Sequence, residues 1–150
     1  MIRQVVWIRW RPISALLGGL ATLLLQSPVP VQAQGLSAVV ITAVRSEKRP
    51  AWEPIAPLAI STKAGHGGAW VEVITEESGY ASAWEAKLGI QSGTLISTVS
   101  ITQGSRVVGF RRTWRMRNTT PPQFGPGIFR IWARSASYPY SARDDIINIR

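Results

Sequence analysis

The sequence predicts an all-β protein, folded as an antiparallel β-sandwich of the immunoglobulin-like type. After residue 33 the chain is a succession of short runs rich in β-branched and aromatic residues, several of which alternate between apolar and polar. Glycine- and proline-rich connections separate these runs. No stretch of this part repeats apolar residues with the helical period over a useful length. About seven or eight strands are therefore expected, and a small β-barrel is the alternative arrangement.

The first 33 residues are predicted to be a secretory signal peptide. Three arginines and no acidic residue precede residue 13, and an uncharged run follows at residues 13–25. This run is shorter than the roughly 20 residues of a membrane-spanning helix, although an uncleaved membrane anchor is the alternative. Two prolines then lead to Val-Gln-Ala at residues 31–33, which suits cleavage after Ala33. We therefore expect one domain at residues 34–150, secreted or periplasmic, from a bacterial source.

The chain contains no cysteine, which excludes disulfides, thiolate metal sites and cysteine nucleophiles together. An exported domain without disulfides depends on its hydrophobic core alone for stability. With 45% hydrophobic and 17% charged residues, the composition is that of a globular protein with such a core.

The strands expected in the first half of the domain differ in their apolar pattern. Residues 36–44 are apolar on both faces, as in a buried strand. Residues 58–62 are expected to form a short strand. Residues 70–76 alternate, with two valines on one face and two glutamates on the other. Residues 82–90 alternate more clearly, with Trp84, Ala86, Leu88 and Ile90 expected to face the core.

The second half is expected to form longer strands. Residues 95–102 should point Leu95, Val99 and Ile101 inward, and a tight turn at residues 103–105 should connect this strand to the next. The remaining expected strands are 106–117, 128–135 and 146–150. Residues 138–145 are expected to form a turn, and Phe124 to be the exposed apolar tip of the loop at residues 118–127.

The charge of the domain is concentrated in its second half. The whole chain has a net charge of +9, and the 14 basic and 8 acidic residues after residue 33 leave +6. Residues 34–90 carry five basic and six acidic side chains, whereas residues 91–150 carry nine arginines and two aspartates.

These arginines alternate along two of the expected strands, so they are predicted to share a face. If residues 106–117 and 128–135 form a hairpin, Arg115 lies opposite Arg130, and Arg111 lies opposite Arg134. The candidate ligand-binding residues are Arg111, Arg115, Arg117, Arg130, Trp132 and Arg134. Arg112 falls on the opposite, core-facing side as an anomaly.

Two interpretations explain such a concentration of arginine. In the first, Glu72, Glu76 and Glu85 on neighbouring strands neutralise it, and the face is simply solvated. In the second, an anionic ligand neutralises it. The arginine fork matches carboxylate, sulfate and phosphate, and an exposed tryptophan stacks on sugar rings.

Other residues are weaker candidates. Trp52, Trp70 and Trp132 could form an aromatic platform for carbohydrate, although covering the ends of the sandwich explains them as well. His66 lies in a glycine-flanked turn without a partner that would make it catalytic. The adjacent acidic pairs point to opposite faces if extended. No catalytic residue, metal site or cofactor is therefore expected.

The sequence accordingly favours an exported, non-catalytic binding module. The expected partner is an anionic polysaccharide or another envelope or extracellular polymer, and not intracellular nucleic acid. The first alternative is a membrane-active or antibacterial protein that acts on an anionic membrane surface. The second is a structural or partner-binding sandwich without a ligand.

Overall fold

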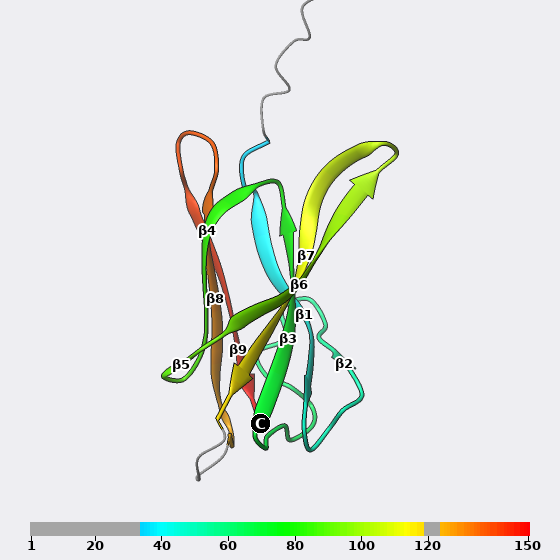
Figure 1. The fold of residues 1–150 in the computed structure, drawn as a ribbon, viewed down its shortest axis with the longest axis vertical. Helices are drawn as coiled ribbons and strands as arrows, with labels where there is room; N and C mark the ends of the chain where they lie inside the picture. Colours follow the sequence, from blue (N-terminus) through cyan, green and yellow to red (C-terminus); the bar gives the residue numbers. More distant parts are fainter. Residues whose placement is uncertain (1–33, 119–123) are drawn as a thin grey trace, which may run out of the picture. The chain divides into compact units, whose positions relative to one another are not determined.

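The computed structural model describes residues 34–118 and 124–150. The predicted signal peptide lies outside the described residues and stays a prediction. Among the described residues all regular structure is β, no helix occurs that could cross a membrane, and nine strands form two antiparallel sheets (Figure 1). The expectation of an all-β fold is confirmed. The two sheets do not close into a barrel, so the alternative of a small barrel is wrong.

The larger sheet has five strands in the order β2-β1-β3-β7-β6. Its bounds are β1 Ala38–Ser46, β2 Glu53–Pro54, β3 Trp70–Ser78, β6 Thr94–Gln103 and β7 Arg106–Arg117. The smaller sheet has four strands in the order β5-β4-β8-β9. Its bounds are β4 Ala81–Leu88, β5 Gln91–Ser92, β8 Gly127–Ser135 and β9 Ala142–Ile149.

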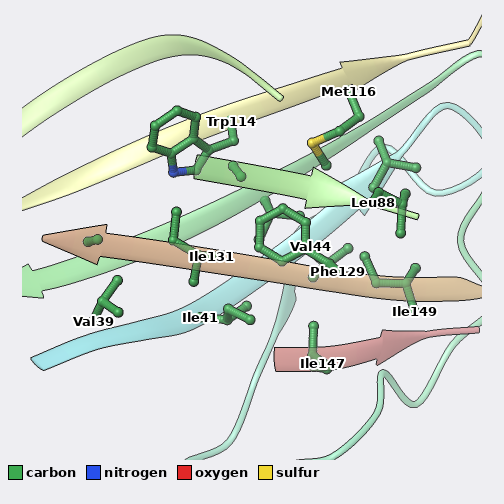
Figure 2. Close-up of a cluster of buried hydrophobic side chains, with 14 of the residues drawn as sticks. Val39, Ile41, Val44, Leu88, Trp114, Met116, Phe129, Ile131, Ile147 and Ile149 are labelled. Carbon is green, nitrogen blue, oxygen red and sulfur yellow. The ribbon is translucent and has the colours of Figure 1, made fainter. Parts of the chain in front are cut away.

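The core lies between the two sheets, because each long strand turns alternate side chains toward the other sheet. Val44 of β1, Met116 of β7, Phe129 of β8 and Ile149 of β9 are all fully buried in one cluster (Figure 2). Burying one such side chain stabilises the fold by roughly 1.5–3 kcal/mol. The outward side chains of the same strands form the two faces on which a partner could bind.

The chain changes sheets abruptly after β3. Gly79 and Tyr80 alone connect β3 to β4, and Gly79 has a φ of 90°, which favours glycine. A side chain at Gly79 would also collide with the backbone carbonyl of Gly35. This short crossover carries the chain from an interior strand of the larger sheet, β3, to an interior strand of the smaller sheet, β4.

Several strand expectations need correction. Residues 58–62 do not form a strand; Ser61 makes only an isolated bridge with Asn148 of β9. The last strand begins at Ala142, within residues expected to form a turn. Ile90 is 94% exposed instead of facing the core, because the chain turns at Gly89, where φ is 57°.

The inward set expected for residues 95–102 is also wrong. An irregularity between Leu95 and Ser97 shifts the pairing of β6 with β7, so Leu95 and Val99 fall on opposite faces. Phe124 is buried, not exposed, and its backbone pairs with Gly68 through two hydrogen bonds of 3.0 and 3.2 Å.

Candidate functional site

The six residues predicted to form one cationic face lie in two different sheets. β7 is flanked by β3 and β6, whereas β8 is flanked by β4 and β9. The hairpin that would set Arg115 opposite Arg130, and Arg111 opposite Arg134, is therefore wrong. The connection from 118 to 126 is longer than the about two to five residues of most hairpin loops, and it carries the chain to the other sheet.

The arginines of β7 face outward beside carboxylates of β3. Glu72 is in register with Arg115, and Glu76 is in register with Arg111. Arg111 Nη2 lies 2.7 Å from Glu76 Oε1, and Arg115 forms an ion pair with Glu72. Arg117 is in register with Trp70. Two of the three expected carboxylates thus neutralise part of this face.

The residues of β8 lie on the outer face of the four-stranded sheet. Arg130 Nη2 is 2.9 Å from Asp144 Oδ2, and the Arg134 guanidinium is 5.9 Å from the centre of the Tyr140 ring. Half-buried Trp132 stands in register between Glu85 and Asp144. Glu85 pairs with Lys87, not with an arginine. The cavity at Trp132 has about 20 Å³, which leaves room for little more than one water molecule.

A different set of residues converges on the outer face of the five-stranded sheet. Arg45 of β1 and Arg115 of β7 are both in register with Glu72 of β3 and share its carboxylate. The Arg45 guanidinium lies 4.4 Å from the Trp52 ring centre, and both guanidinium groups lie within 6 Å of Trp70, at 5.9 and 5.6 Å. We call these five residues the Arg–Trp cluster.

Burial within the Arg–Trp cluster is uneven. The Glu72 side chain is 0% exposed although it points away from the core, and the guanidinium groups of both arginines bind its carboxylate. The Trp52 ring, by contrast, is 36% exposed. The guanidinium groups bind Glu72, and the whole side chains of Arg45 and Arg115 are 32% and 30% exposed.

A hollow of about 390 Å³ adjoins this cluster through Trp52. This volume falls in the range of small-molecule sites, about 300–1,000 Å³. Its lining runs along one segment of the chain: Lys48, Arg49, Pro50, Ala51, Trp52 and Glu53. Both basic side chains are exposed, so the hollow extends the cationic surface of the Arg–Trp cluster.

Glu53 fixes the wall of the hollow. Its carboxylate accepts hydrogen bonds from the backbone N–H groups of Lys63 and Ala64, at 2.6 and 3.0 Å, and lies 3.1 Å from His66 Nε2. Burial opposes ionisation of Glu53, but these hydrogen bonds outweigh it and lower its pKa below the ordinary value. His66 is buried, with no partner at Nδ1. Glu53 is thus a side-chain partner of His66 that the sequence analysis did not find.

The arrangement is suited to binding charged groups. Among residues 34–118 and 124–150, no group of three or more histidine, aspartate or glutamate side chains could hold a metal ion.

The sequence analysis missed Arg45, Lys48 and Arg49 as candidates because they lie in the half of the domain with balanced charge. The signal that could have found Arg45 is Glu72, an outward-facing glutamate between two valines of β3, because a basic residue in register on a neighbouring strand is favourable.

Comparison with known proteins gives one relation. No curated protein and no solved structure matches the chain. The model of a family described as a domain of unknown function (DUF4879) matches residues 27–149, and the chain therefore belongs to that family.

Proposed function

We propose that this domain is an exported, non-catalytic module that binds an acidic glycan or a related anionic polymer of the envelope or extracellular space. The binding surface is the Arg–Trp cluster together with the hollow beside Trp52. The observation that carries the proposal is the convergence of Arg45 and Arg115 on one buried carboxylate, next to an exposed indole. This differs from the surface expected from the sequence, which included the arginines of β8.

The charges of the surface favour an anionic ligand. Two arginines share Glu72, so one positive charge of the Arg–Trp cluster stays unbalanced. Lys48 and Arg49 add two more positive charges at the hollow. The Glu53 carboxylate accepts hydrogen bonds from the backbone N–H groups of Lys63 and Ala64. An arginine that keeps free donors can bind carboxylate, sulfate or phosphate in a fork geometry.

The aromatic residues favour a sugar-containing ligand. Trp52 offers one partly exposed ring at the border between the cluster and the hollow. A flat apolar ring beside cationic donors suits a sugar ring that carries an acidic group, because the two parts of the ligand then have separate partners. Trp132 has no comparable cavity beside it.

We also infer that the fold is an immunoglobulin-like sandwich. In that fold one sheet has the strand order A-B-E-D, and the other contains C, F and G. The order β1-β3-β7-β6 matches the first sheet, and β4-β8-β9 matches the second, with β5 as an added edge strand next to β4. Binding surfaces on such domains are built from outer strands and loops on a rigid scaffold.

The test is chromatography of the purified protein on heparin and on a neutral polysaccharide over a salt gradient. We expect retention on heparin, and earlier elution of the double variant Lys48→Ser/Arg49→Ser and of Trp52→Ala. Losing one charge-assisted hydrogen bond weakens binding on the order of tenfold. The matched control Arg130→Ser/Arg134→Ser removes the same charge from the other sheet and should elute nearly as the unchanged protein does.

Other outcomes decide against the proposal. Equal shifts for both double variants would mean that net charge alone causes retention. Elution in the void of both columns would favour a structural or partner-binding role. Release of dye from anionic liposomes, without retention on heparin, would favour the membrane-active alternative.

A further inference from the structure

The four outer edges of the two sheets are protected to very different degrees. β2 has two residues and ends in Pro54, and β5 also has only two residues. The edge of β9 is covered by residues 60–62, through hydrogen bonds of 3.0 Å from Asn148 N to Ile60 O and 2.9 Å from Thr62 N to Asn148 O. Short edges, prolines and covering loops are the usual ways to prevent strands from pairing with another chain.

β6 is neither short nor covered and has no proline, and two irregularities of its pairing, one toward each end, leave the middle of the strand regular. It is ten residues long, pairs only with β7, and contains no charged residue, proline or glycine. Nine of its ten residues are exposed, and Val99 near its centre is 55% exposed. In Figure 1 the turn between β6 and β7 projects away from the neighbouring strands. A long, uncharged and uncovered edge is the arrangement that accepts an additional strand.

We propose that β6 pairs antiparallel with β6 of a second copy of this chain, forming a two-fold symmetric dimer. The irregularities of β6 lie between Leu95 and Ser97 and between Ile101 and Thr102, so residues 97–101 form its regular segment. Val99 is the middle residue of that segment. Pairing about Val99 sets it opposite its own copy, Thr98 opposite Ser100, and Ser97 opposite Ile101.

The charge pattern favours a second copy as the partner. Every pair in this register is uncharged, so the same surface can meet itself without repulsion. Arg111 is in register with Val99, and its guanidinium forms an ion pair with Glu76 of β3, on the side of β7 that faces away from β6. In the dimer the two copies of Arg111 would be three strand spacings apart, roughly 14 Å, which exceeds the screening length of about 8 Å at physiological salt.

This inference does not rest on the proposed ligand. The pairing is centred on Val99, whereas the Arg–Trp cluster reaches β6 only through Arg115, which is in register with Thr94 at the first residue of the strand. One strand pair is smaller than the standard interface of about 1,600 Å², so the dimer is expected to depend on concentration. The test is light scattering coupled to size-exclusion chromatography over a concentration series. The mass should rise toward twice that of one chain as the concentration increases.

The variants test the register directly. Val99→Lys and Val99→Glu should each weaken dimerisation on the order of tenfold, because like charges then lie opposite each other. An equimolar mixture of the two variants should restore the dimer, since Val99 meets its own copy. Ile90→Lys, which adds the same charge at an equally apolar but remote position, is the control and should dimerise normally.

A protein that stays monomeric at all concentrations would overturn the proposal. So would a dimer that the Val99 variants leave unchanged, or a mixture that fails to restore pairing. Growth into larger species would also contradict it, because a two-fold pair closes on itself. Thermal unfolding of each variant in the dilute, monomeric range separates lost pairing from lost folding.

Discussion

Arg112 and Arg115 lie three residues apart on β7, and each meets a glutamate of β3, yet they belong to opposite faces of the sheet. Arg112 points into the core, where it and Glu77 are 8% and 0% exposed. Arg115 points outward and stays 30% exposed over the buried carboxylate of Glu72. The two glutamates are equally buried, so the difference lies in the arginines: the side of the strand on which each arginine falls decides how much of it solvent can reach.

The inner pair is tightly enclosed. Arg112 Nε donates to Glu77 Oε1 at 2.8 Å and Nη1 donates to Thr98 at 3.0 Å, while the guanidinium lies 4.0 Å from the Trp84 ring centre. Burial raises the pKa of Glu77, and Arg112 opposes this effect. The Trp84 indole also favours the ionised form and so lowers that pKa, although neither Trp84 Nε1 nor Glu77 Oε2 has a hydrogen-bond partner.

The first prediction breaks the inner pair. Arg112→Ala leaves Glu77 buried without its counterion, and we expect the free energy of unfolding to fall by about 3–5 kcal/mol. Arg115→Ala is the matched control: Glu72 keeps Arg45, so the expected loss is about 1 kcal/mol. Urea unfolding measures both. Similar losses would show that the two faces do not differ as described.

The second prediction uses pH to distinguish carboxylates inside and outside the core. Hydrogen bonds lower the pKa of Glu53 below 4.5, so its stabilising contribution is present above about pH 4.5 and is lost as pH falls through the lowered pKa. The pKa of Glu77 is raised by burial, so stability falls as pH rises from about 4.5 through the raised pKa.

Urea unfolding of the unchanged protein, Glu53→Gln and Glu77→Gln over this pH range measures both effects. The stability difference between the unchanged protein and Glu53→Gln should increase with pH, whereas the difference from Glu77→Gln should decrease. If both stability differences changed with pH in the same direction, the opposite pKa shifts of Glu53 and Glu77 would be contradicted.

The third prediction concerns an ion pair without burial. Arg130 and Asp144 are 58% and 45% exposed, so Arg130→Ala should change the free energy of unfolding by less than about 1 kcal/mol. Thermal unfolding at low and high salt checks this. A larger loss at low salt would mean that the Arg130–Asp144 ion pair contributes substantially to the free energy of unfolding.

The alternation of the sequence predicted the local structure better than the pairing of strands. Val71 and Val73 face the core opposite Glu72, as expected, because a period of two is a property of a single strand. The neighbours of β7 are set by contacts with β3, more than thirty residues away in the chain, and alternation does not encode them. Arg112 did indicate a long-range contact, because an arginine on a core face needs a buried carboxylate as its partner. Glu77 is that partner.

The same limit explains the candidate site. The arginines of β7 and β8 were grouped because they are close in sequence, whereas Arg45, Trp52 and Arg115 come together only when β1 and β7 pair with opposite edges of β3. Burial of an outward-facing glutamate such as Glu72 is a product of that pairing. The composition shows that the protein is cationic, but it does not show which arginines come together on the folded surface.

The loop that carries His66 is tied to the chain's last residues. Arg150 N donates to Thr62 Oγ1 at 3.0 Å, and the Arg150 carbonyl accepts a hydrogen bond from His66 N. His66 in turn supports Glu53 at the hollow. Residues 148–150 and the wall of the hollow are thus linked, so we expect removal of those residues to change the shape of the hollow, although they do not line it. A variant that disturbs these residues is therefore expected to act on the proposed binding surface from a distance.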